Sequence, residues 1–267
     1  MDASVPGGPR NLLGRAPAAA GSVGGVLTAP DVRALAPWFA PERPGPLIHA
    51  HAAATGVGRV RVDRWSDPRA VHVELPGGNH ALAGDPAALD LADLAGLVDA
   101  STHWLPLLRA VDPETAPWSR LFAALPAQAP VPVSDARLLG PSDAAALAAL
   151  DPGSAWIHET WGGVGGLAAA GVARAVVVDG RAVSVAVPFY VGEQFEDVGV
   201  VTDPAYRGRG PSTACAAALV ADIRARGRTP SWTTSPPNRA SRAVAERLGF
   251  VPAGTGVLHA VRTPVPD

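Results

Sequence analysis

The stretch Thr-Asp-Pro-Ala-Tyr-Arg-Gly-Arg-Gly-Pro-Ser, at residues 202–212, decides which fold we expect of this sequence. It follows a strand-like run at 195–202 and precedes a segment with helical spacing at 211–226, which Pro211 opens. A strand, a glycine-bearing turn and a helix start together form an anion site. Free backbone N–H groups converge there, and the helix dipole adds positive potential.

Four residues of this turn favour a phosphate as the anion. Gly208 and Gly210 can adopt positive φ and let a phosphate approach the backbone. Arg207 and Arg209 add positive charge. The alternative is an ordinary strand-to-helix turn with solvated arginines, and the turn alone leaves both interpretations open.

The residues on both sides of the turn predict a domain that mixes strands and helices. The pair Asp179-Gly180 between two β-branched runs is typical of a hairpin with a type I′ turn. The expected elements are a helix after Ser142, strands 173–178, 181–187 and 195–202, helix 211–226, strand 231–235, helix 239–248 and strand 257–262. This order predicts a mixed α/β fold.

Two blocks of this part of the chain resemble the GNAT superfamily of acyl-CoA-dependent N-acetyltransferases. The first is Arg207-x-x-Gly210-x-Ser212, similar to the family's cofactor-binding pattern Arg/Gln-x-x-Gly-x-Gly/Ala, with Ser in the last small position. The second block, 238–250, resembles the family's Asn-x-x-(Ala/Ser)…Leu-Gly-Phe segment. The spacing of the two blocks also matches, and the resemblance covers roughly residues 135–262, with features of a tandem GNAT subgroup.

The resemblance implies a GNAT-type fold, with a central mixed sheet flanked by helices, and acetyl-CoA as cosubstrate. The two central parallel strands, 195–202 and 231–235, would splay apart and admit the pantetheine arm between them. The residues implied to bind the cofactor are Val200, Val201 and Thr202 along the arm, Arg207, Gly208, Arg209, Gly210, Pro211 and Ser212 at the pyrophosphate, and Thr233, Asn238 and Ser241 in the second block.

The family's reaction is direct attack of a deprotonated amine on the thioester, with backbone N–H groups stabilising the oxyanion. A base is needed because an ammonium cannot attack. We expect Glu196 or Glu159 to be this base, since burial raises a carboxyl pKa toward neutrality. His158 is a third candidate, and the alternative for each glutamate is a plain surface position. Tyr190 and Trp161 are candidates for the substrate pocket, and a plain core position is the alternative for both.

The sequence departs from the family at the position of the usual general acid. Many relatives place a Tyr seven residues after the Asn that opens the second block. In this chain that Asn is Asn238, and the seventh residue after it is Ala245. Water or another side chain must then protonate the departing thiolate, or the thiolate leaves unassisted, which a thiol pKa near 8.5 tolerates.

The first part of the chain predicts a second, smaller domain. It shows a hairpin at 57–75 and helical spacing through 86–124, and no second Arg-x-x-Gly turn follows the hairpin. The expected divisions are a disordered tail at 1–30, a degenerate GNAT-like domain at 31–125, a Pro/Ala-rich linker at 126–132 and the catalytic domain at 133–267. An unrelated α/β cap is the alternative for 31–125.

Composition excludes several other classes. The 267 residues are 48% hydrophobic and 17% charged, which suits a globular core. All 22 basic residues are Arg, but the net charge of −2 gives no strong attraction to nucleic acid or membranes. The single Cys215 excludes an internal disulfide, and we expect no metal. We find neither an apolar span nor a signal peptide and expect a cytoplasmic protein.

Three functions therefore compete. The first is an acetyltransferase, monomeric or homodimeric, acting on a small amine, an amino sugar or a protein amine. The second is an acetyl-CoA-binding sensor or pseudo-enzyme without transferase activity, which Ala245 supports. The third is an interaction module that uses the arginine-rich surface, which the net charge of −2 disfavours.

Overall fold

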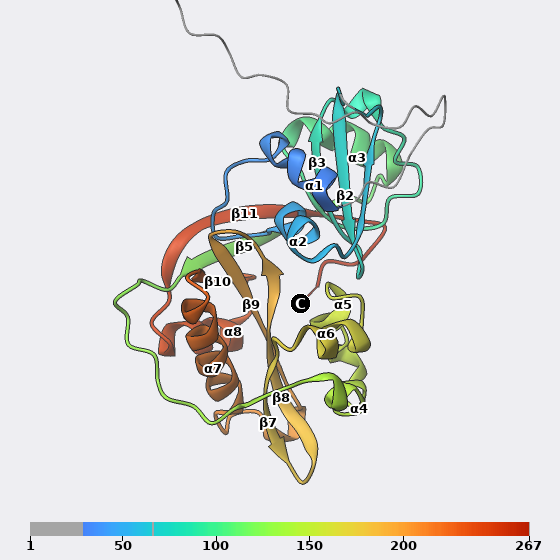
Figure 1. The fold of residues 1–267 in the computed structure, drawn as a ribbon. Coiled ribbons are helices and arrows are strands. Elements are labelled where there is room, and N and C mark those ends of the chain that lie inside the picture. Colours follow the sequence, from blue (N-terminus) through green and yellow to red (C-terminus); the bar gives the residue numbers. More distant parts are fainter. Residues whose placement is uncertain (1–28, 66, 267) are drawn as a thin grey trace, which may run out of the picture.

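The computed structural model describes residues 29–65 and 67–266, so the tail expected at 1–30 lies almost wholly outside the described residues. Within these residues, eleven strands form one continuous mixed sheet in the order β1-β2-β3-β4-β11-β5-β10-β9-β8-β7-β6 (Figure 1). No helix of the described part is long and apolar enough to cross a membrane. The mixed α/β architecture expected from the sequence is confirmed.

The strands up to the expected linker are β1 (Arg59–Val62), β2 (Ala70–Leu75), β3 (Asn79–Gly84), β4 (Gly96–Asp99) and β5 (Ala116–Ala124). The later strands are β6 (Arg137–Leu138), β7 (Arg174–Val178), β8 (Arg181–Val191), β9 (Phe195–Thr202), β10 (Thr229–Thr234) and β11 (Val251–Val261). The helices are α1 (Ala29–Ala34), α2 (Ile48–Thr55), α3 (Leu105–Val111), α4 (Ala144–Ala148), α5 (Trp156–Glu159), α6 (Val164–Ala170), α7 (Pro211–Ala225) and α8 (Arg239–Arg247). Short 3₁₀ turns join several of them.

The two parts of the chain exchange strands in the middle of the sheet. β5, from before the expected linker, pairs antiparallel with β10 and β11. β11, the last strand, pairs antiparallel with β4 of the first part. Each part therefore completes the sheet of the other. The division at 126–132 remains a prediction.

Short sequence patterns correctly predicted the ranges of several strands and helices in the second part of the chain. Asp179 and Gly180 both have positive φ, 49° and 76°, so the β7–β8 hairpin has the expected type I′ turn. β9 matches its expected range, and α7 begins at Pro211 as expected. The hairpin expected at 57–75 is the antiparallel pair β1–β2.

The expectation of helical spacing through 86–124 is wrong. This segment contains α3 and two short 3₁₀ turns, but also the strands β4 and β5. Leu91 and Leu94 have the spacing of a helix, but they lie in a loop. Both side chains are buried in the core, and this burial explains the apolar pattern without a helix. β11 also starts earlier than the expected 257–262, because Gly256 lets the strand pass the ring of Phe122: a Cβ there would lie 2.5 Å from the ring.

Helices cover both faces of the sheet around β9 and β10 (Figure 1). Val198 and Trp232 belong to the core beneath α7 and α8. Val201 belongs to the core beneath α5 and α6. Successive strand residues point to opposite faces, so even-numbered residues of β9 face α7 and odd-numbered ones face the α5 side. This alternation determines the position of every candidate side chain on β9.

Candidate active site

A V-shaped opening separates β9 from β10. The two strands pair in parallel only where 195–197 meet 229–231. Beyond Asp197 and Ser231, β9 continues against β8 and β10 continues against β5. The splay expected from the family resemblance is therefore present, and its apex lies at Asp197 and Ser231.

The turn at the open end of β9 has the geometry of an anion site. Gly208 and Gly210 have φ of 75° and 92°, and a Cβ at either position would meet nothing within 4 Å. Within the described residues, the amides of 208–210 donate to no acceptor. The first amides of α7, at Ser212 and Thr213, add further free donors as in any helix start. Such a row of free N–H groups fits a phosphate.

The two arginines of this turn are exposed and close to its backbone. Arg207 donates from Nε to the carbonyl oxygen of Thr202 at 3.3 Å. The Arg209 guanidinium lies 5.6 Å from the ring centroid of Tyr206. Both add positive charge next to the free amides, and residues 207–210 between them form a contiguous exposed segment.

The second predicted block begins at the same edge of the sheet, because β9 and β10 are parallel. Asn238 caps α8, and its side-chain oxygen accepts from the N–H of Ser241 at 3.0 Å. The Ser241 hydroxyl oxygen accepts from Trp232 Nε1 at 2.9 Å. Beside them, a shallow hollow of about 220 Å³ is lined partly by Arg239 and Arg242. The sequence block thus places two further cations, with Glu246 beside them, at the edge of the sheet where the 202–212 turn also lies.

Glu196 lies on the opposite face of the sheet from the α5 side. Its carboxylate is 1% exposed and accepts from Arg226 Nε and Nη2 at 2.9 and 2.6 Å. Arg228 Nη1 donates to it as well, at 2.8 Å. Both oxygens are therefore occupied by guanidinium groups, and this arrangement supports a structural role rather than proton transfer.

Glu159 and His158 lie on α5 near the first part of the chain. The Glu159 carboxylate covers the turn between β2 and β3, where a Cβ on Gly77 would come within 2.5 Å of Oε2. Burial lowers the pKa of His158, against the raising effect of the Glu159 charge. Ala245 is 6% exposed in the core beneath α8, so that position has no room for the usual tyrosine.

Asp197 is the acidic residue at the apex of the opening, and the sequence analysis did not single it out. It is 3% exposed, and Oδ1 accepts from Ser231 Oγ at 3.0 Å and from Thr233 Oγ1 at 2.9 Å. Within the described residues, Oδ2 accepts no hydrogen bond. Burial raises the pKa of Asp197 to about 7, although both hydroxyls and the Arg120 charge lower it. The alternation along β9 was the available signal, but it does not say which face is catalytic.

The strand register places further polar residues on the face of Asp197. Tyr190 of β8 is opposite Asp197, and its hydroxyl donates to Asn79 Oδ1 of β3 at 2.8 Å. Arg120 of β5 lies two residues from Phe122, the partner of Thr233. Burial raises the pKa of Asp99, at the end of β4, to about 6. Residues from both parts of the chain therefore form one polar cluster at the centre of the sheet.

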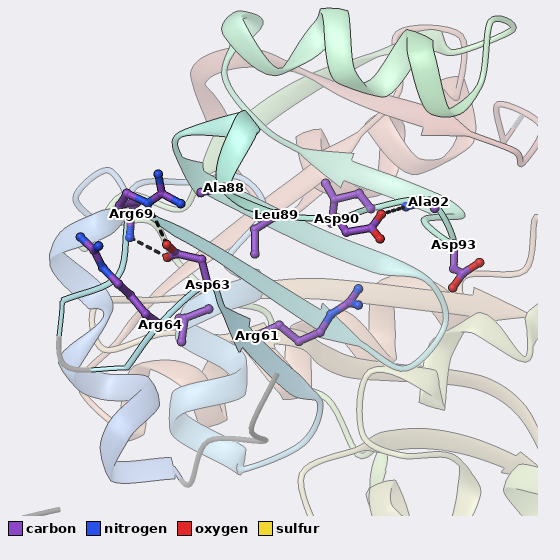
Figure 2. A pocket seen from close by; sticks show the side chains of 11 residues that line it. Arg61, Asp63, Arg64, Arg69, Ala88, Leu89, Asp90, Ala92 and Asp93 are labelled. Carbon is purple, nitrogen blue, oxygen red and sulfur yellow. Dashed lines mark hydrogen bonds and ion pairs between the residues drawn. The ribbon is translucent and has the colours of Figure 1, made fainter. Parts of the chain in front are cut away.

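A larger hollow, of about 690 Å³, lies at the β1 edge of the first part. Figure 2 shows its charged lining, in which Asp63 accepts from Arg69. Arg61 donates to His72, and His72 is hydrogen-bonded to His80, each at 3.0 Å. No residue predicted for the cofactor or the base lines this hollow. In the described residues, no group of three or more His, Cys, Asp or Glu side chains could hold a metal ion.

Comparisons with known proteins agree with this geometry. The family model for GNAT acetyltransferases matches residues 142–255. The chain is 41% identical over 212 residues to a Streptomyces virginiae protein described as an uncharacterized N-acetyltransferase in the mutA 5′ region, and the alignment covers 75% of this chain and 89% of that relative. The chain therefore belongs to the GNAT acetyltransferase family and is an enzyme of the N-acetyltransferase class.

Several solved structures share the fold over nearly their whole length. A GCN5-related N-acetyltransferase-like protein from Streptococcus suis superposes with a TM-score of 0.67 at 20% identity, covering 87% of this chain and 99% of that one. A GNAT-family acetyltransferase from Colwellia psychrerythraea has a TM-score of 0.57 at 13% identity, covering 89% and 98%. A tandem GNAT protein from the clavulanic acid biosynthesis pathway has a TM-score of 0.51 at 13% identity, covering 90% and 98%.

Proposed function

We propose that this chain transfers the acetyl group of acetyl-CoA to the nitrogen of an amine acceptor. One observation carries the proposal: the parallel pairing of β9 and β10 stops at Asp197 and Ser231, and the opening leads to the free amides of 208–210. Thr202 lies five positions after Asp197, which is about 17 Å along the strand. That span is comparable to the stretch from the pyrophosphate to the thioester, so the reacting end would lie near Asp197.

The cofactor is held mainly by backbone groups in this proposal. The amides of 208–210 and of the first turn of α7 bind the pyrophosphate, and Arg207 and Arg209 add charge. The edge of β9 at 200–202, which has no strand on the β10 side, offers hydrogen bonds to the pantetheine arm. Asn238 and its neighbouring arginines lie at the same edge of the sheet.

Asp197 replaces Glu196 as the proposed base. A carboxylate whose pKa is about 7 is matched to proton transfer near neutral pH. Its free Oδ2 takes the proton of the acceptor ammonium, directly or through water. The amine nitrogen then bonds to the thioester carbon and loses its second proton to solvent as the amide forms. The carbon–sulfur bond breaks, and the departing thiolate takes up a proton from solvent.

The test compares coenzyme A release with coenzyme A binding. The wild-type protein should release free thiol from acetyl-CoA in the presence of an amine panel. Asp197→Asn should lower kcat by about 10²-fold or more, the usual contribution of a general base, and change the coenzyme A Kd less than twofold. Asp179→Asn, at the exposed β7–β8 turn, is the matched carboxylate control.

Two outcomes would contradict the proposal. Coenzyme A binding without thiol release across the panel would favour the sensor function. Full activity of Asp197→Asn across pH would exclude Asp197 as the base. Glu159 and His158 would then be the remaining candidates for the base.

A further inference from the structure

Arg120 faces the same central cluster as the proposed base. β5 pairs with β10 so that Phe122 is opposite Thr233, and Thr233 donates to Asp197. Arg120 is two residues from Phe122 on β5 and therefore lies on the same face. The register thus places one cationic side chain on the acceptor side of the opening.

The Arg120 guanidinium has no anionic partner in the described part of the chain. It forms no ion pair with any described carboxylate, and its Nε is buried without an acceptor. Its Cζ lies 3.6 Å from the ring centroid of Trp118, which stacks against one face of the guanidinium. Burial lowers the pKa of Arg120 to about 10. A largely buried cation without an anion is unfavourable, and the stacked ring offsets only part of this cost.

The charged groups around Arg120 form no ion pair with it. Asp197 on β9 is near enough to raise the pKa of Arg120 but forms no ion pair with it. Asp99 on β4 is near Arg43, whose Cζ is 5.5 Å from the ring of Phe122. Tyr190 on β8 donates to Asn79 rather than toward Arg120. The cluster therefore presents a proton acceptor at Asp197 and an unpaired fork of N–H donors at Arg120.

We propose that Arg120 binds a carboxylate on the acceptor, so that the acceptor is an amino-carboxylate whose amine reaches Asp197. The proposal rests on the acetyl transfer proposed above. A guanidinium fork matches a carboxylate with two parallel hydrogen bonds, and the stacked Trp118 holds the fork in one plane. An acceptor with amines alone would instead bring a second cation toward Arg120.

The experiment uses pairs of acceptors that differ by one carboxylate. The pairs are phenylalanine and phenethylamine, tryptophan and tryptamine, lysine and cadaverine, and 4-aminobutyrate and butylamine. Wild-type kcat/KM should favour the carboxylate member of at least one pair by tenfold or more. Arg120→Gln should raise the KM of that member at least tenfold, about 1.4 kcal/mol, and should abolish the preference. Arg120→Lys should retain part of it.

Matched controls separate substrate binding from folding and from the cofactor. Arg61→Gln, in the remote hollow of Figure 2, should change neither KM. Arg120→Gln should leave the acetyl-CoA KM within twofold of wild type, because the 208–210 turn is retained. It should move the pH midpoint of the rate upward, because the Arg120 charge lowers the pKa of Asp197. If Arg120→Gln does not fold, the preference of the wild-type protein within each pair is itself the test.

Three results would overturn the inference. One is equal use of both members of every pair, and another is an Arg120→Gln effect on the acetyl-CoA KM alone, which would assign Arg120 to the cofactor. If no pair is acetylated, calorimetry measures the binding of each carboxylate member to the coenzyme-A-loaded protein. The third result is that none of these members binds, which would overturn the inference. Loss of coenzyme A binding itself would instead refute the acetyl transfer on which the inference rests.

Discussion

Asp197 and Glu196 are adjacent carboxylates with opposite surroundings. Glu196 is paired with two arginines on the α7 side, whereas Asp197 has only two hydroxyl donors on the α5 side. The guanidinium groups stabilise a charged carboxylate, and burial without a paired cation raises the pKa of its neighbour. The alternation of one strand therefore separates a structural carboxylate from a titrating one.

The activity should depend on pH through Asp197. The base must be ionised to accept a proton, so kcat/KM should rise with pH around an apparent pKa of about 7. Asp197→Asn should remove this rise. A pH profile of the rate at acceptor concentrations well below KM measures kcat/KM, and a midpoint near the ordinary carboxyl value of about 4 would contradict the assignment.

The same pKa shift has a consequence for stability. Because burial makes the folded state hold the Asp197 proton more tightly than the unfolded state, its contribution to stability is lost as pH rises from about 4 to about 7. Asp197→Asn should therefore raise Tm at pH 8 more than at pH 5. Melting curves at both pH values check this, and a lower Tm at pH 8 would contradict it.

Glu196→Gln should affect stability rather than chemistry. The change leaves Arg226 and Arg228 facing a buried amide, and breaking such a pair costs about 3 kcal/mol of unfolding free energy. Glu74→Gln removes an exposed pair with Arg59 and should cost less than about 1 kcal/mol. Urea denaturation compares the two, and a large loss of kcat in folded Glu196→Gln would return Glu196 to the mechanism.

At the scale of an element, α7 connects the two ends of the site. Its first turn follows the free amides of 208–210, and Arg226, just after its last turn, binds Glu196. Gly210 begins the helix with φ of 92° and Gly227 follows it with φ of 75°. These glycines have the same backbone requirement, but only Gly210 lies in the proposed cofactor site.

Gly210→Val and Gly227→Val form a matched pair. A Cβ at either position meets nothing within 4 Å, so both variants carry similar backbone strain and similar losses of stability. Only Gly210→Val should block the approach of the pyrophosphate and weaken coenzyme A binding at least tenfold, about 1.4 kcal/mol. Calorimetry measures both affinities, and equal binding by the two variants would refute the anion site.

At the scale of the whole molecule, the two parts of the chain are held together by more than the exchanged strands. His51 of α2 accepts from the N–H of Val191 at 3.1 Å, and its other ring nitrogen donates to the carbonyl of Thr160 at 2.8 Å. The Glu42 carboxylate accepts from the N–H groups of Glu193 and Gln194, each at 2.7 Å. Burial lowers the pKa of His51 to about 4, so this contact persists with neutral histidine at physiological pH. These hydrogen bonds hold the two parts of the chain together at the end of β8, next to Tyr190 of the polar cluster.

The protein should bind one coenzyme A per chain. The first part also has a parallel strand pair, β3 with β4, but β3 leads to Asp85 and a 3₁₀ turn at 86–88 rather than to a glycine-arginine turn. Asp85 uses its carboxylate to cap that turn, which places negative charge where a phosphate would bind. Titration calorimetry measures the stoichiometry, and a value near two would contradict this interpretation.

Features that depend only on neighbouring residues could be predicted from the sequence. The Asp179-Gly180 turn, the β9 strand, the 208–210 turn and the Pro211 helix start all follow from local dihedral preferences and hydrogen bonds, so a single sequence suffices to find them. The exchange of β5 and β11, and with it the placement of Arg120 beside the proposed site, is visible only in the folded chain. It also decided which face of β9 meets α5, and so that Asp197 rather than Glu196 lies at the apex. Strand pairing and burial join residues far apart in the chain, and their free energy depends on contacts that no local pattern contains.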